Sequence, residues 1–100
     1  MNYQEENIKS GKHYGIESQL NQTQEEAAEL IQAINKYRRA RGVGQETDLG
    51  TAESRANLVE EIVDVSIMIE QLCDLLLITQ SEFDRVYETK VARTMRRRLG

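Results

Sequence analysis

Two pairs of carboxylates are the residues of this chain best suited to chemistry. These acids are Glu26, Glu29, Glu61 and Asp64. The two members of each pair are three residues apart, so on a helix they emerge as neighbours on one surface. Bringing four negative charges together costs free energy unless protons or cations neutralise them. Oxygen-only clusters suit a hard cation such as Mg²⁺, which commonly binds carboxylates, water and substrate phosphates together. The spacing therefore predicts a magnesium site, with phosphate chemistry as its use.

The second pair lies inside an apolar stripe rather than on a charge-rich surface. The stripe has heptad-like spacing and consists of Leu58, Ile62, Val65, Ile69, Leu72 and Leu76. On a wheel of about 100° per residue, Glu61 lies only about 60° from its centre, and Asp64 lies at its edge. A carboxylate so close to a buried seam is costly without a partner. One such pair is most often a solvated helix face, but two pairs on successive helices favour a metal site.

Long helices are expected to position these acids. The 100 residues include no proline and only six glycines, which favours helices over sheets and turns. Apolar periodicity predicts helices over about 16–41 and 51–77. A capping box that begins at Thr79 opens a third long helix. A short helix over 3–10, ended by Gly11, precedes them.

These elements predict an all-α fold. We expect a single domain over 1–100, an antiparallel helical bundle of three to four helices per chain. Residues 1–13 form a short preface, and 42–52 form a flexible, glycine-containing connection. Thr51 is expected to cap the second long helix.

The second long helix is apolar on nearly all sides, which predicts a partner. Opposite the stripe lie Val59, Val63, Ile67, Leu77 and Ile78. A helix that is apolar all round is usually buried all round, and the other helices of one short chain hardly cover it. We therefore expect homo-oligomerisation, as a dimer or a tetramer, to complete the bundle.

Charge and cysteine content narrow the remaining classes. The formal net charge of -4 argues against general binding to nucleic acid, although the last helix is basic. Its cations are Lys90, Arg93, Arg96, Arg97 and Arg98. The single Cys73 cannot form an internal disulfide, so a reducing cytoplasm is the expected location. No signal-peptide stretch is evident, and no apolar run reaches the roughly 20 residues of a membrane span.

The order of the motifs resembles that of the MazG-type, all-α nucleoside triphosphate pyrophosphohydrolases. Members of that superfamily carry Glu-Glu-x-x-Glu on one helix and Glu-x-x-Asp on the next, followed by a basic helix. The corresponding segments here are 25–29 (EEAAE), 61–64 (EIVD), and the pair Lys90 and Arg93. The likeness covers roughly residues 14–95.

The resemblance implies cleavage of a (d)NTP between its α and β phosphorus atoms, giving a (d)NMP and pyrophosphate. It implies that Mg²⁺, with Mn²⁺ as the alternative, is held by the four acids of the two pairs. Glu25 or Glu26 would take the proton of the attacking water, and the sequence does not choose between them. Lys90 and Arg93 would neutralise the outer phosphates. Cleansing of the nucleotide pool is one use of such an activity.

Residues around the start of the first long helix are candidates for contact with the base. The ring of Tyr14 offers a stacking surface, and the amides of Gln19 and Gln22 offer hydrogen bonds to a base edge. A structural tyrosine and solvated helical glutamines explain the same residues equally well.

Two further function classes stay open. The chain is alternatively a non-catalytic helical oligomerisation or interaction module, whose acids are structural and bind no Mg²⁺. Less favoured is a nucleic-acid-binding protein that uses the arginines of 96–98, whose binding would depend steeply on salt. The identity of the base and of the sugar does not follow from the sequence.

Overall fold

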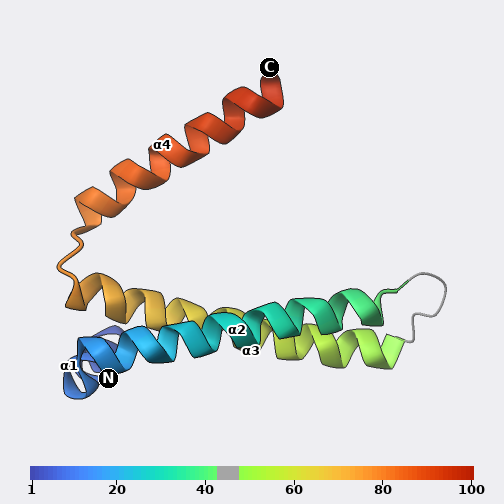
Figure 1. Cartoon of the computed structure of the whole chain (residues 1–100), viewed down its shortest axis with the longest axis horizontal. Coiled ribbons are helices and arrows are strands. Elements are labelled where there is room, and N and C mark those ends of the chain that lie inside the picture. Colours follow the sequence, from blue (N-terminus) through green and yellow to red (C-terminus); the bar gives the residue numbers. More distant parts are fainter. Residues whose placement is uncertain (43–47) are drawn as a thin grey trace.

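The protein folds as four α-helices (Figure 1). We obtained the structure as a computed structural model, which describes residues 1–42 and 48–100. The helices are α1 (Tyr3–Tyr14), α2 (Ile16–Ala40), α3 (Asp48–Leu75) and α4 (Gln80–Leu99). No strand occurs in these residues, which confirms the all-α class. Within the same residues, no helix combines the length and the apolar character needed to cross a bilayer.

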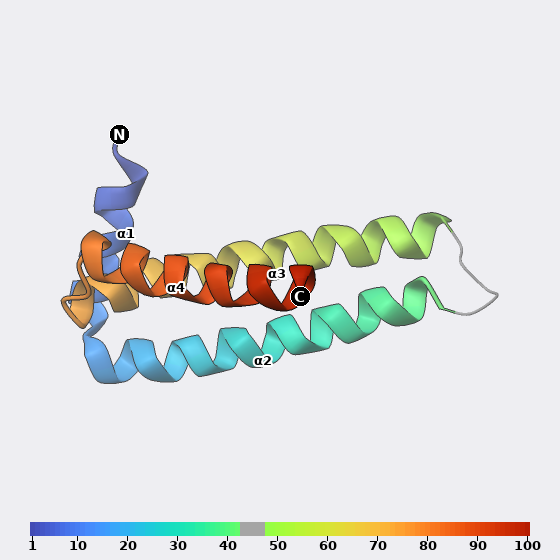
Figure 2. The same cartoon turned by 90° about the horizontal axis from the view of Figure 1, so that it is seen from above.

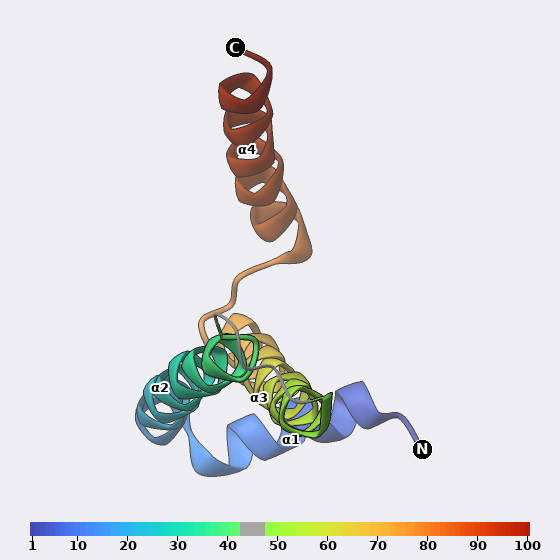
Figure 3. The same cartoon turned by 90° about the vertical axis from the view of Figure 1, so that its right-hand side faces the viewer.

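The helices α2 and α3 lie side by side and run in opposite directions (Figure 2). The short α1 packs across one end of this pair and contacts both helices. By contrast, α4 packs against none of the other three helices in the part of the chain that is described. It projects to the side of the α2–α3 pair that faces away from α1 (Figure 3). Only its first turn comes near them, where Phe83 borders a hollow together with Ile8 and Cys73.

The first helix is longer than the sequence predicts, because Gly11 does not end it. Asn2 caps α1 by accepting a hydrogen bond from the backbone N–H of Glu5 (3.1 Å). The helix then passes through Gly11, which is buried, and ends at Gly15, whose φ of 88° suits glycine. The expected stop at Gly11 is therefore wrong. Gly11 instead allows the backbone of α1 to approach α3 closely.

A chain of amide hydrogen bonds fixes the junction of α1, α2 and α3. Gln19 of α2 donates to Oε1 of Gln71 on α3 (2.7 Å), and Gln71 donates to Oδ1 of Asn7 on α1 (2.7 Å). Asn7 in turn donates to Oε1 of Glu70 (3.0 Å). Gln19 and Gln71 are both buried, so unpaired amides there would be costly. The network therefore fixes how the three helices pack.

The helix α3, Asp48–Leu75, begins and ends earlier than the predicted helix over about 51–77. The helix begins at Asp48, so Thr51 lies inside it rather than capping it, and its Oγ1 donates to the carbonyl of Ala40 (3.3 Å). Of the expected 42–52 connection, residues 43–47 lie outside the described part.

The C-terminal end of α3 has a left-handed residue, Leu77, with a φ of 57°. The N–H of Leu77 donates to the carbonyl of Asp74, and the N–H of Ile78 donates to the carbonyl of Cys73. This pair of bonds is a Schellman ending with leucine at the usual glycine position.

The fourth helix begins as predicted. Thr79 caps α4 by accepting a hydrogen bond from the N–H of Glu82 (3.1 Å). The connection from α3 to α4 is therefore only the four residues 76–79.

Very little apolar surface is buried within one chain. The buried hydrophobic residues of the described part are Ala33 (1% exposed) and Met68 (5% exposed). Many larger apolar side chains of α2 and α3 remain exposed, including Ile31, Ile34, Val59, Ile62, Val63, Ile67 and Ile69. An exposed apolar surface of this extent is typical of a protein-interaction site.

Candidate metal site

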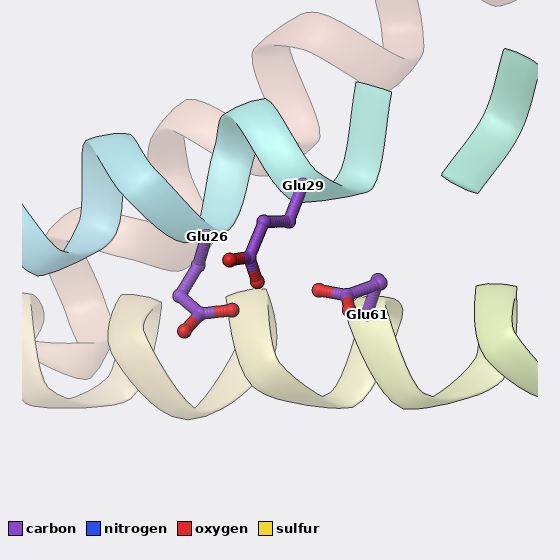
Figure 4. Close-up of side chains that lie close together, drawn as sticks. All are labelled: Glu26, Glu29 and Glu61. Carbon is purple, nitrogen blue, oxygen red and sulfur yellow. The ribbon is translucent and has the colours of Figure 1, made fainter. Parts of the chain in front are cut away.

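Three carboxylates converge between α2 and α3 (Figure 4). Glu26 and Glu29 project from α2, one helical turn apart, and Glu61 projects from α3. One carboxylate oxygen from each lies within 4.8 Å of the others. Three hard oxygen donors at such separations can share one small divalent cation after modest side-chain movement.

Two oxygens of this cluster have no hydrogen-bond donor. Oε2 of Glu26 and Oε2 of Glu61 are both buried and accept no hydrogen bond from the residues that the structure describes. Oε1 of Glu26, in contrast, accepts a hydrogen bond from Nε2 of Gln22 (2.9 Å). Buried, unpaired carboxylate oxygens are costly, and a cation satisfies them without a further donor. The donor set therefore fits Mg²⁺ or Mn²⁺.

The carboxyl groups of Glu26 and Glu61 also have altered pKa values. Burial raises the pKa of Glu26 above its ordinary value, the hydrogen bond from Gln22 partly opposes this, and the charges of Glu29 and Asp64 add to the rise. Burial likewise raises the pKa of Glu61, and the charges of Glu29 and Asp64 add to it, followed by smaller effects of Glu26 and Glu60. Both groups thus hold their negative charge less readily than an isolated glutamate.

The fourth predicted ligand, Asp64, lies at the rim of the cluster. It is half-buried on α3, one turn after Glu61, and its charge acts on both Glu26 and Glu61. It does not belong to the group of oxygens within 4.8 Å. Asp64 is therefore placed to contribute charge or a more distant ligand.

The other predicted catalytic acid, Glu25, lies apart from the three converging carboxylates. It is exposed on α2, and its Oε1 accepts a hydrogen bond from Asn21 (3.4 Å). Glu26 lies inside the cluster, so of the two candidate bases it is the one beside the other carboxylates.

The predicted phosphate and base contacts are dispersed in a single chain. Lys90 and Arg93 lie on α4, which does not pack on the helices of the cluster. Tyr14 is exposed at the end of α1. Its ring lies edge-on to the ring of His13, with the two ring centroids 4.9 Å apart. The amide nitrogen of Gln19 is bonded to Gln71, as described above.

Gln22 has a contact that the sequence analysis did not assign. It lies one helical turn before Glu26 and donates directly to its carboxylate. The i, i+4 spacing of a glutamine and an acid was a usable signal, since such pairs commonly hydrogen bond on helices.

We compared the chain with known protein families, curated proteins and solved structures. No protein-family profile, curated protein or solved structure matches this chain. The assignment of a function therefore depends on the motifs and on the geometry described above.

Proposed function

We propose that this protein is a Mg²⁺-dependent nucleoside triphosphate pyrophosphohydrolase of the MazG type. The observation that carries the proposal is the convergence of Glu26, Glu29 and Glu61 from two helices, with two buried oxygens that lack donors. Structural acids are normally paired with bases or backbone N–H groups, whereas these acids face one another. A cationic ligand accounts for that arrangement, and the motif order accounts for the choice of a triphosphate.

The acids of α2 and α3 would bind the metal ion and activate the attacking water. Glu26, Glu29 and Glu61, with Asp64 at the rim, would hold Mg²⁺. The bound ion supplies positive charge for the anionic triphosphate and lowers the pKa of water. Glu26 would accept the proton of the attacking water, with Glu25 as the exposed alternative. The water oxygen bonds to the α phosphorus, and the bond from that phosphorus to the bridging oxygen breaks, which releases pyrophosphate.

The remaining predicted contacts would bind the rest of the substrate. Lys90 and Arg93 would hold phosphate oxygens, the latter with bidentate geometry. Tyr14 would stack on the base, with Gln22 near its edge, whereas the buried Gln19 would hold α2 against Gln71 rather than contact the base. We further propose that the protein acts in the cytoplasm as a homo-oligomer, a dimer or a tetramer, because so much apolar surface of α2 and α3 is exposed in one chain.

The direct test is a substrate screen with a matched control. Purified protein with Mg²⁺ is incubated with canonical and modified (d)NTPs, and both pyrophosphate and monophosphate are measured. Activity should be lost in Glu61→Gln and kept in Glu53→Gln, an exposed acid on the same helix. Release of single phosphate would move the cleaved bond to the outer phosphates. The absence of turnover and of Mg²⁺ binding would favour an interaction module instead.

One observation favours that second candidate function. The helix α4 presents an uncovered face with apolar and basic residues, which is a typical surface for a partner helix. An interaction module would keep this surface and its partner after Glu61→Gln, with no catalytic change to detect.

A further inference from the structure

The exposed apolar face of α4 includes a cation, Lys90. The apolar residues of this face are all between two-fifths and two-thirds exposed; they are Phe83, Val86, Tyr87, Val91 and Met95. On a helical wheel, Lys90 lies about 20° from Phe83 and about 40° from Val86. It also lines both of the shallow hollows that run along this helix. Any surface that covers the apolar face must therefore also accommodate a positive charge.

The α2–α3 pair offers a surface of the complementary kind. Ile62 and Ile69 are exposed on α3 and lie about 80–100° from Glu61 about the helix axis. Gln71, which contacts α1, lies about 80° from Glu61 in the other direction. One apolar side of α3 is thus left open by α1, and Glu61 lies next to it.

Charge favours the same match. The last part of the chain, residues 89–100, contains five cations and no acid, whereas the central turns of α2 and α3 contain Glu25, Glu26, Glu29, Glu60, Glu61 and Asp64. The buried oxygens of Glu26 and Glu61 lack donors, and Lys90 has no acid partner among the described residues. A lysine that is desolvated by docking needs an anion, which the carboxylates would supply in the empty site and the substrate phosphates would supply beside bound Mg²⁺.

The turn between α3 and α4 directs α4 away from its own chain. The Schellman bonds at Leu77 and Ile78 fix the direction of the chain as it leaves α3. Figures 1 and 3 show α4 diverging from the α2–α3 pair beyond this turn. With this turn in place α4 packs on no other helix in the described part of its own chain, and docking onto another copy leaves the turn unchanged.

We propose that α4 of one copy packs on the open apolar side of the α2–α3 pair of a second copy, where its Lys90 completes the acidic site. This inference deepens the proposed function and rests on it for the role of Lys90. Each site then draws carboxylates from one chain and a cation from the other. An isolated chain has no complete site.

Isotope-resolved crosslinking tests, without any enzymatic assay, whether α4 of one copy packs on another copy. Chains labelled with ¹⁴N and ¹⁵N are mixed, equilibrated and treated with a zero-length carbodiimide, which joins lysines to carboxylates that touch. Crosslinks of Lys90 to Glu29, Glu61 or Asp64 should be mixed-label in about half of cases, as expected for a symmetric dimer that exchanges freely. The pair Lys9 and Glu6, 3.4 Å apart on α1, is the internal control and should stay same-label. Exclusively same-label links of Lys90 to these acids, or none at all, would overturn the proposal.

Complementation between two inactive variants gives the second test. Glu61→Gln lacks a carboxylate, and the double variant Lys90→Ala, Arg93→Ala lacks the cations of α4. If α4 acts on the neighbouring chain, mixing the two should restore about a quarter of parental activity, since half of the dimers are mixed and each has one intact site. If α4 acts on its own chain, no activity returns, and the proposal fails. Mixed-label crosslinks in a parent that hydrolyses no triphosphate would leave the assembly standing and reject the proposed function.

Discussion

Gly11 of α1 and Gln71 of α3 approach each other so closely that any side chain at position 11 would require Gln71 to shift. A methyl group built on Gly11 would lie 3.1 Å from both Cβ and Cγ of Gln71. Gln71 is buried and held at both ends of its amide, by Gln19 and by Asn7, at 2.7 Å each. The side chain therefore has little freedom to move away.

Gly11→Ala should destabilise the protein, although alanine is the better helix former. The intrinsic helix preference alone would stabilise α1 by about 1 kcal/mol. Overpacking against a fixed neighbour costs roughly 1–3 kcal/mol, which outweighs that gain. Urea denaturation should give a lower free energy of unfolding for the variant. Ser10→Ala, at the exposed neighbouring position, is the control and should change it by less than about 0.5 kcal/mol. A more stable Gly11→Ala variant would show that Gln71 can yield.

The same pair of residues shows what the sequence could and could not predict. Helix type followed from composition and apolar period, and the acids of 26–29 and 61–64 were located by spacing alone. Gly11 was misread because a glycine that ends a helix and a glycine that admits a neighbouring helix look alike in one sequence. Thr51 was misread as a cap because the true start of α3 lies among polar residues with no apolar period. The direction of α4 was not predictable, since the four-residue connection permits several turns and only the backbone shows which one forms.

The substitution Asp64→Asn should show whether Asp64 is a metal ligand or a structural acid. The substitution keeps the size of the side chain and removes one charge that acts on Glu26 and Glu61. The metal-free variant should melt no lower than the metal-free parent, because repulsion within the cluster falls. Saturating Mg²⁺ should stabilise the parent by about 2.7 kcal/mol at 100 times its dissociation constant, and the variant by less. The comparison is made by calorimetry with and without Mg²⁺. An Asn variant that melts well below the parent in both conditions would assign Asp64 a structural hydrogen bond or ion pair.

The metal-free protein should become less stable as the pH rises through the cluster's titration. The folded-state pKa values of Glu26 and Glu61 lie above the ordinary value of 4.5, so the folded chain holds these protons to higher pH than the unfolded chain. Their contribution to stability is therefore fully present below pH 4.5 and is lost as the pH rises through the raised folded values. The double variant Glu26→Gln, Glu61→Gln should show a flatter decline in denaturant titrations above that pH. Stabilisation by Mg²⁺ should run the other way and grow with pH, since protons compete with the cation. An unchanged slope in the double variant would contradict the assignment of the raised pKa values to this pair.

The left-handed backbone of Leu77 should make glycine more stable than alanine at this position. Both substitutions remove the same side chain, which is 84% exposed, so their difference reports the backbone. A non-glycine residue in this conformation costs roughly 1–2 kcal/mol, and Leu77→Gly should exceed Leu77→Ala in unfolding free energy by about that amount. The same pair of substitutions at Leu76, whose φ is not positive, is the control and should give the opposite order. Equal stability of the two variants at Leu77 would argue against the Schellman ending.

An unassembled chain would expose α4 to proteolysis, because this helix packs on no other helix among the described residues of its own chain. A helix of 20 residues that packs on no other helix is only marginally stable in water, so its helicity depends on docking. At low protein concentration the segment after Thr79 would then lose its helix and become a substrate for trypsin-like proteases, with cleavage sites at Arg85, Lys90, Arg93 and Arg96. Assembly would protect the same peptide bonds. The rate of cleavage in this segment would therefore report the fraction of chains that have found a partner, and chains in excess would be the ones removed.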